Sequence, residues 1–345
     1  MLTLVLETPG KLIATDTPTP ALAPAAGETL VRIHRVGVCG TDLHAYAGRQ
    51  PFFTYPRILG HELGIEVLAV GAGVTNVSVG DRCAVEPYLN CGRCIACRQG
   101  KPNCCRTLQV LGVHTDGGHR SRIILPAAKL HPSKTLGYDQ LALVETLGIG
   151  AHAVGRAQLR AGESVAVIGA GPIGLAVMQF AKAEGARVIV VDISPSRLAF
   201  CRDRIGVDAT VNASAGDVAA QLEAPTDGDL PTAVFDATGS PKSMHAAFDY
   251  PAPGGRLIFV GLVQADIAFH DPHFHRRELT ILSSRNALPT EFTRIIRLIE
   301  EGKIDTAPWI THRAALAEVP AKFESWTKPE TGVIKAIIEI PDDVG

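Results

Sequence analysis

The sequence lacks any uninterrupted apolar stretch of about 18 residues, the length that a membrane-spanning helix needs. It also lacks a long run of charge of one sign, and its 33 basic and 35 acidic residues give a formal net charge of −2. We therefore expect no membrane span, no nucleic-acid partner and no attachment to an anionic membrane surface. Residues 1–11 carry no charged segment ahead of their short apolar run. This start predicts a first strand, not a signal peptide, and we expect a cytoplasmic protein.

A chain of 345 residues is long enough for about two domains, and it can bury substantial cores. It contains eight cysteines, of which five fall between positions 91 and 105. A secreted disulfide framework is one interpretation. The size of the chain and the absence of an export signal instead favour clustered thiols that hold metal.

Four of these cysteines follow the spacing C-x2-C-x2-C-x7-C: Cys91, Cys94, Cys97 and Cys105. Four thiolates on a short loop suit a closed, tetrahedral structural zinc site. An iron–sulfur cluster requires a related spacing and is the alternative. Cys104 is adjacent to a predicted ligand and could exchange with Cys105.

From residue 163 onwards, apolar runs of strand length alternate with helix-like stretches. This alternation predicts a parallel sheet with crossover helices, buried on both faces because the apolar runs contain few polar residues. The expected strands are 164–168, 187–191, 233–236 and 256–260, and the expected helices are 172–184, 195–204, 214–223 and 242–250.

The flanking segments have a different pattern. Residues 1–90 predict an irregular, mostly β domain with a strand at 29–36, and the pattern after Ser284 predicts a helix at 291–301 and a closing strand at 332–340. The α/β segment is therefore expected as an insertion between two parts of another domain.

A glycine-rich segment, Gly169-Ala170-Gly171-Pro172-Ile173-Gly174, follows a predicted buried strand and opens a predicted helix. In that context the first glycine allows a tight turn, the second allows close approach to a pyrophosphate, and the third allows helix and strand to pack closely. The start of the helix offers free N–H groups to the phosphates. The segment predicts a dinucleotide site.

Asp192 ends the next predicted strand, about 20 residues further on. Its carboxylate can accept hydrogen bonds from the ribose hydroxyls and would repel a 2′-phosphate, which favours NAD over NADP. Arg197 could instead meet a 2′-phosphate. Asp192 could also cap the helix that begins near Pro195, although Ser194 is better placed to do so.

A second group of possible metal ligands is dispersed in the sequence: Cys39, His61, Glu62 and Glu145. A cysteine, a histidine and a carboxylate together would form an open zinc site with room for water or substrate. Each residue is ambiguous alone, since a single cysteine is most often a small core residue.

With these motifs in place, the chain resembles the zinc-containing medium-chain dehydrogenases/reductases, in the polyol (sorbitol) dehydrogenase-like branch. The segments that carry the resemblance are 38–42, 60–62, 91–105, 169–174 and 333–335. It implies an α/β chain with a GroES-like β catalytic domain at 1–148, including a zinc lobe at about 88–108. A Rossmann domain with a doubly wound parallel sheet would follow at 149–285, and 286–345 would return to the catalytic domain.

The resemblance also implies roles for matching residues. Cys39, His61 and a carboxylate would bind a catalytic zinc, with Glu62 and Glu145 able to trade direct ligation. Thr41 would touch the reacting oxygen, and His44 would pass the proton to solvent. Lys335 matches a late basic position near the cofactor or cleft. The matching cofactor contacts are Gly169, Gly171, Pro172, Ile173, Gly174, Asp192, Arg197, Val260, Gly261, Leu262, Ser283, Ser284 and Arg285.

The implied activity is reversible, NAD-linked oxidation of a secondary alcohol, with two zinc ions per chain. We expect a polyol, sugar or sugar acid as substrate, because the implied substrate contacts His114, Arg285 and Asn286 are polar. Phe52, Phe53 and Tyr55 would form an apolar wall or simply pack their loop.

The alternatives are an NADPH-dependent aldehyde or ketone reductase of the same fold, and a non-catalytic protein that binds zinc and nucleotide. Relatives suggest a homodimer or homotetramer, in which strand 256–260 is the expected point of sheet extension.

Overall fold

The computed structural model describes residues 1–51 and 53–341, and the chain separates into two compact units. Unit 1 contains Met1–Glu145 and Leu288–Gly345, and unit 2 contains Thr146–Ala287. The chain therefore builds most of unit 1, then unit 2, and returns to unit 1. Within the described residues, no helix combines the length and apolar character needed to cross a membrane.

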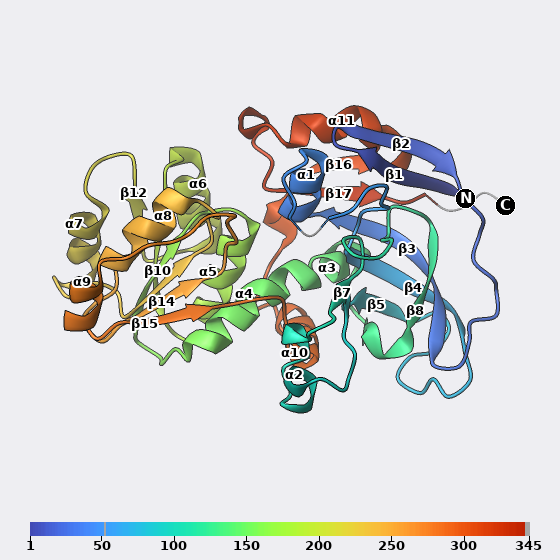
Figure 1. Cartoon of the computed structure of the whole chain (residues 1–345), viewed down its shortest axis with the longest axis horizontal. Helices are drawn as coiled ribbons and strands as arrows, with labels where there is room; N and C mark the ends of the chain where they lie inside the picture. The colour runs from blue at the N-terminus through green and yellow to red at the C-terminus, as the bar shows by residue number, and fades with distance from the viewer. Residues whose placement is uncertain (52, 342–345) are drawn as a thin grey trace. The chain divides into compact units, whose positions relative to one another are not determined.

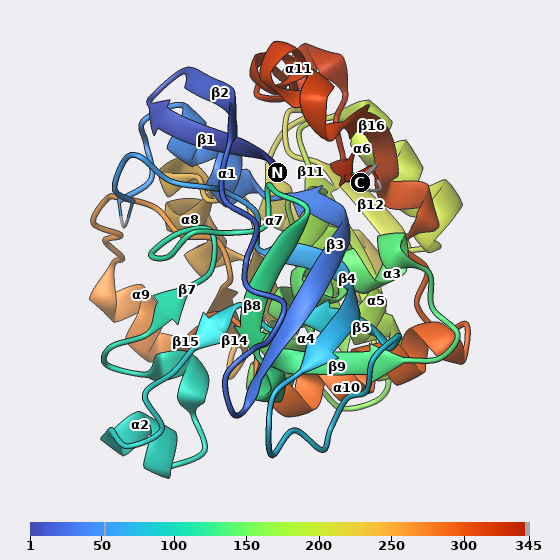
Figure 2. The same cartoon turned by 90° about the vertical axis from the view of Figure 1, so that its right-hand side faces the viewer.

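Unit 1 is built on a mainly antiparallel sheet whose strands follow the order β16-β17-β3-β4-β5-β9, with β8 also paired to β3. Figure 2 shows β8, β3 and β4 side by side. Most of the side chains of β3 are buried, and with β4 they contribute much of the apolar core of the unit. The strands are β3 (Glu28–Val38), β4 (Glu62–Val70), β5 (Arg82–Val85), β8 (Arg122–Pro126), β9 (Leu130–Ser133), β16 (Ile310–Ala315) and β17 (Lys335–Glu339).

Smaller elements complete unit 1. Two-stranded sheets are formed by β1 with β2 and by β6 with β7. The elements are β1 (Leu2–Thr8), β2 (Lys11–Asp16), β6 (Tyr88–Leu89), β7 (Gln109–Val110), α1 (Gly40–Tyr46), α2 (Ile95–Arg98), α3 (Tyr138–Ala142), α10 (Pro289–Glu300) and α11 (Val319–Trp326). Helix α4 (Val144–Ala157) begins in unit 1 and continues into unit 2.

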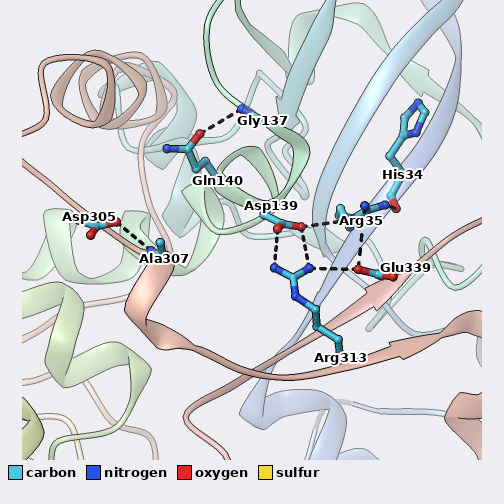
Figure 3. Close-up of polar contacts among 9 residues, drawn as sticks. All are labelled: His34, Arg35, Gly137, Asp139, Gln140, Asp305, Ala307, Arg313 and Glu339. Atoms are coloured by element: carbon cyan, nitrogen blue, oxygen red, sulfur yellow. Dashed lines mark hydrogen bonds and ion pairs between the residues drawn. The ribbon is translucent and has the colours of Figure 1, made fainter.

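The two ends of the chain meet in this sheet, because β17 pairs antiparallel with β3 and places Ile337 opposite Gly37. A network of partly exposed charges links the same region (Figure 3). Arg313 donates to Asp139 over 2.6 Å and to Glu339 over 3.1 Å, and Arg35 also donates to Asp139. Four segments that are distant in sequence are thereby joined.

Unit 2 is a six-stranded parallel sheet of order β12-β11-β10-β13-β14-β15 (Figure 1). Helix α5 packs on β10, β11 and β13, and α6 packs on β11 and β12. The elements are β10 (Ser164–Ile168), α5 (Pro172–Ala183), β11 (Arg187–Asp192), α6 (Pro195–Phe200), β12 (Ala209–Asn212), α7 (Val218–Glu223), β13 (Ala233–Asp236), α8 (Pro241–Ala246), β14 (Arg256–Phe259), α9 (Asp271–Arg276) and β15 (Thr280–Ser283).

The predicted fold class is confirmed: a mostly β unit is interrupted by a doubly wound parallel-sheet unit. Several element bounds differ from the expectations by a few residues: β17 begins at Lys335 and α8 ends at Ala246. Two further differences have a clear physical reason. Helix α7 starts four residues later than predicted, at Val218, because the Asp217 side chain caps it by accepting from Ala219 N and Ala220 N. The strand expected to extend the sheet between subunits, β14, is hydrogen-bonded on both sides by β13 and β15. The edge strands of this sheet are β12 and β15.

Candidate metal and cofactor sites

Three of the four dispersed ligand candidates come together in unit 1. One ligand atom each from Cys39, His61 and Glu62 lies within 4.8 Å of the others. Cys39 directly follows β3 and Glu62 begins β4, and the antiparallel pairing of these strands sets Gly37 opposite Glu62. The thiol of Cys39 also caps helix α1 by accepting from Thr41 N over 3.4 Å. Strand register thus brings together donors that the sequence separates.

A buried carboxylate, that of Asp42, lies next to the His61 ring. The Nδ1 of this ring lies 3.7 Å from Asp42 Oδ1, while Asp42 Oδ2 accepts from Cys39 N over 2.9 Å. Burial opposes a charge on His61, but Asp42 and the Cys39 thiol outweigh it and raise the pKa of His61 well above its usual value. Carboxylates placed behind histidines in this way orient metal-binding imidazoles.

Glu62 is paired with a buried lysine from the other end of the chain. Lys335, in β17, donates to Glu62 Oε1 over 2.5 Å and to the carbonyl of Val38 over 3.2 Å. Burial by itself would lower the pKa of Lys335. The attraction of Glu62 and of the Cys39 thiol is larger and raises this pKa. The second oxygen, Glu62 Oε2, is buried without a hydrogen-bond partner. A buried carboxylate oxygen left in that state fits a metal ligand.

Glu145 does not belong to this close group of ligand atoms. It lies in the first turn of α4, is buried, and accepts a 2.5 Å hydrogen bond on Oε1 from the Tyr88 hydroxyl. Burial raises the pKa of Glu145, against the attraction of His61. Burial likewise raises the pKa of Tyr88, and the Glu145 carboxylate adds to the effect.

The four spaced cysteines also converge. Their sulfur atoms lie within 4.8 Å of one another, and Cys104 is exposed and is not one of the group. Cys91 N donates to Cys105 Sγ over 3.3 Å, and Asn90 Nδ2 approaches Cys97 Sγ at 3.7 Å. Hydrogen bonds from the Arg93 and Cys94 backbone lower the pKa of Cys91 to about 6. A thiolate is the form that binds metal, so this arrangement fits a closed four-sulfur site.

The two predicted proton-relay residues both lie on α1. Thr41 is in its first turn, two residues after Cys39, and is partly buried, whereas His44 is in its last turn and exposed. Partial desolvation, with a contribution from Arg49, lowers the pKa of His44. A neutral imidazole at the surface can accept a proton and release it to solvent.

The glycine-rich segment of unit 2 connects β10 to α5 as predicted. Gly169 has φ +98°, in the region that favours glycine. A Cβ on Gly174 would lie 1.8 Å from the carbonyl oxygen of Gly169, whereas a Cβ on Gly171 would meet no atom within 4 Å. The N-terminus of α5 has no side-chain cap. Its N–H groups, with open space at Gly171, fit the phosphates of a dinucleotide.

Asp192 uses both carboxylate oxygens on nearby backbone, accepting from Ala170 N over 2.7 Å and from Ser194 N over 2.8 Å. Ser194, as expected, caps α6. Burial lowers the pKa of Arg197, whereas Asp192 opposes this change. The remaining predicted cofactor contacts, Val260–Leu262 and Ser284–Arg285, follow the ends of the parallel strands β14 and β15. Ligands of such sheets bind at the carboxyl ends of the parallel strands.

The predicted substrate contacts are placed individually. His114 lies in the turn after β7, and its Nδ1 accepts from Val110 N over 3.0 Å. In unit 2, Arg285 is exposed and Asn286 adopts φ +55°. Phe53 and Tyr55 pack edge to face at 4.8 Å and lie against the core of unit 1. Phe52 lies outside the described residues.

Three residues of the open site were not predicted in their observed roles: Asp42, Tyr88 and Lys335. Asp42 belongs to the motif around Cys39, which was a usable signal. Lys335 was expected near the cofactor or cleft, but its ammonium group binds Glu62. No local pattern marks Tyr88, because its partner Glu145 lies 57 residues away.

Comparison with known proteins agrees with this geometry. A family described as "Alcohol dehydrogenase GroES-like domain" matches residues 25–135, and one described as "Zinc-binding dehydrogenase" matches residues 172–301. L-Galactonate-5-dehydrogenase from Escherichia coli (strain K12) is 40% identical over 335 residues, which are 97% of this chain and 98% of that protein.

Two similar solved structures contain nicotinamide cofactors. A short chain alcohol dehydrogenase (rspB) from Escherichia coli CFT073, complexed with NADH, has a TM-score of 0.89 at 32% identity and covers 98% of this chain and 99% of its own. A zinc-binding dehydrogenase from Sinorhizobium meliloti 1021, bound to NADP, has a TM-score of 0.90 at 28% identity and covers 98% of both chains.

Proposed function

The chain belongs to the zinc-type polyol dehydrogenases of the medium-chain dehydrogenase/reductase family, and on that premise we propose that it oxidises a secondary alcohol of a sugar acid, sugar or polyol to the ketone or lactone, reversibly, with NAD. The observation that carries this proposal is the group of Cys39, His61 and Glu62 ligand atoms, with a buried carboxylate oxygen that has no partner. Those donors suit an open zinc site.

We assign two zinc ions to each chain. Cys39, His61 and Glu62 would hold the catalytic ion with Glu145 nearby, and Cys91, Cys94, Cys97 and Cys105 would hold the structural ion. Catalysis is assigned to the segments proposed from sequence, 1–148 and 286–345, and cofactor binding to 149–285. The free thiols of the cysteine lobe suit the reducing cytoplasm, where we place the protein.

When bound, the catalytic zinc lowers the pKa of the substrate hydroxyl, and the nicotinamide accepts the hydride. The chain's own residues then move the proton. Thr41, two residues from Cys39, would accept the proton at its hydroxyl oxygen and pass on its own hydroxyl proton. His44 would take up the relayed proton at a ring nitrogen and release it to solvent. The lowered pKa of His44 keeps its ring neutral near pH 7 and ready for the next proton.

Asp192 supports NAD as the cofactor, because its carboxylate would repel a 2′-phosphate. Since one structural relative holds NADP, an NADPH-dependent aldehyde or ketone reductase is the second candidate. Measuring kcat/KM with NAD and NADP in parallel separates the two, and a preference for NADP would favour the reductase.

For the substrate, the 40% identical relative is named for a sugar acid, L-galactonate. Arg285 is exposed at the end of the cofactor unit, and we propose that it binds the substrate carboxylate, with His114 and Asn286 contacting hydroxyls. Polar contacts of this kind would favour a polyhydroxy substrate over an alkyl alcohol, because each polar group that a bound substrate buries and leaves unpaired costs about 1–3 kcal/mol.

The test is a substrate screen in which the absorbance of the reduced nicotinamide measures the rate of reaction. Simple alcohols, polyols, aldoses and aldonic acids are compared with wild-type protein and with Arg285→Ala. We expect aldonic acids to give the highest kcat/KM and Arg285→Ala to lose that preference. If ethanol or benzyl alcohol were the best substrate, the polyhydroxy assignment would be wrong.

We also propose a homodimer or homotetramer. Because β14 is interior, sheet extension would have to use an edge strand, β15 or β12. Light scattering gives the assembly size directly.

A further inference from the structure

Tyr88 takes no part in the proposed reaction, yet its hydroxyl donates to Glu145 Oε1 over 2.5 Å beside the open site. Tyr88 is 2% exposed and Glu145 is 5% exposed. Because so little of either side chain is exposed, few solvent molecules can replace the Tyr88 hydroxyl as donor to the carboxylate. A short hydrogen bond to a buried carboxylate is among the stronger kinds, and losing it leaves the oxygen unsatisfied.

The packing of Tyr88 fixes the position of its hydroxyl. Tyr88 lies in β6, where it pairs with Val110 of β7. Its ring meets the Phe292 ring at 6.3 Å and an interplanar angle of 75°, and Phe292 stacks in turn on His131 at 4.8 Å. The strand pairing fixes the backbone of Tyr88, and a rotation of its side chain away from Glu145 would break the ring contact with Phe292.

The two carboxylates near Cys39 and His61 are therefore in different states. Glu62 gives Oε1 to Lys335 and keeps Oε2 without a partner, and one of its oxygens belongs to the close group of ligand atoms. Glu145 is outside that group and is anchored to Tyr88. We propose that Tyr88 is a positioning residue, which holds Glu145 out of the ligand set so that Glu62 completes it. This inference rests on the metal site of the proposed function.

Cobalt(II) provides a readout that is independent of substrate. The full chain, with zinc retained in the cysteine lobe, is loaded with cobalt(II) at the open site, and its visible ligand-field absorption is recorded. Tyr88→Phe keeps the ring and removes only the hydroxyl. We expect its spectrum to differ from that of the wild type, because Glu145 is released to become a ligand. The double variant Tyr88→Phe/Glu145→Gln should return to the wild-type spectrum.

A matched control removes a buried hydroxyl elsewhere in unit 1. Thr29 is fully buried and donates to the carbonyl of Leu125 over 3.0 Å, so Thr29→Val should lower stability without changing the cobalt spectrum. A Tyr88→Phe spectrum identical to that of the wild type would overturn the proposal. A merely structural role for Tyr88 predicts that result.

If Tyr88→Phe does not fold, two other variants decide. We expect Glu62→Gln to change the spectrum and to weaken cobalt binding by about tenfold or more, and Glu145→Gln to do neither. The reverse pattern would overturn the proposal. Failure of the wild-type protein to bind cobalt at all would refute the metal site itself and with it the proposed function. Bound cobalt that is insensitive to Tyr88 would refute only this inference.

Discussion

At the scale of single residues, Asp192 combines two tasks. Its carboxylate anchors the glycine-rich turn through Ala170 N and the next loop through Ser194 N, and we propose that it selects the cofactor. We expect Asp192→Ser to lower kcat/KM for NAD and to narrow the preference over NADP, because repulsion of the 2′-phosphate is relieved.

The control for this prediction is Asp208→Ser. Asp208 Oδ2 accepts from Val188 N over 2.7 Å, so this variant also loses a carboxylate bound to strand backbone, at a position with no proposed cofactor contact. The ratio of kcat/KM for the two cofactors should not change in Asp208→Ser. An unchanged ratio in Asp192→Ser would remove Asp192 as the selector.

His119 couples the stability of unit 1 to pH. It is fully buried, both ring nitrogens lack partners, and burial, with a smaller contribution from His61, lowers its pKa from 6.5 to about 3. The unfolded chain binds this proton below pH 6.5 and the folded chain only near pH 3. The free energy of unfolding is therefore highest, as far as His119 is concerned, above pH 6.5. Between pH 6.5 and about pH 3 it falls by about 1.4 kcal/mol for each unit of pH.

We expect His119→Leu to remove that part of the acid sensitivity. The free energy of unfolding in urea, measured at several pH values from neutral to mildly acidic, should fall less steeply for the variant than for the wild type. Parallel curves would mean that His119 does not titrate in this way.

At the scale of elements, the turn between β10 and α5 separates packing from ligand binding. A Cβ at Gly174 would collide with the backbone oxygen of Gly169, whereas a Cβ at Gly171 would face open space. We expect Gly174→Ala to lower the melting temperature and weaken NADH binding together. Gly171→Ala should weaken NADH binding with little change in melting temperature. NADH fluorescence titration and thermal unfolding measure the two effects, and equal melting temperatures for the two variants would contradict this interpretation.

The cysteine lobe offers a similar comparison. Because structural zinc binding contributes directly to folding free energy, Cys97→Ser should lower thermal stability and release one zinc ion per chain. Cys104→Ser changes an exposed cysteine that is not in the four-sulfur group and should do neither. A fully stable Cys97→Ser protein would rule out a structural metal site in the lobe.

At the scale of the whole molecule, the two ligand groups predict two zinc ions per chain. A chelator should remove the ion of the open site first, with loss of activity, because that site leaves room for water or substrate whereas the four-sulfur site is closed. Metal analysis before and after chelation checks both the count and the order. One ion in the untreated protein would remove one of the two assignments.

Local patterns in the sequence predicted much of what the fold shows. The strand–turn–helix around Gly169–Gly174 and the alternation in unit 2 depend on neighbours a few residues apart. Helix α7 was predicted to begin at residue 214 but begins at Val218, because the Asp217 side chain caps it there. Strand β14, expected as the point of sheet extension, lies between β13 and β15, because strand order within a sheet does not follow from the hydrophobic pattern of one strand.

By itself, the sequence predicted the fold class and the candidate ligand types, because spacing and periodicity act within single turns, strands and loops. The family followed from the resemblance of its motifs to those of known dehydrogenases. Only the tertiary structure decided how the two carboxylates are held. Lys335 reaches Glu62 across 273 residues through the pairing of β17 with β3, and Tyr88 reaches Glu145 across 57 residues. Such contacts depend on strand register and on buried side chains meeting in three dimensions, which no local pattern of residues encodes.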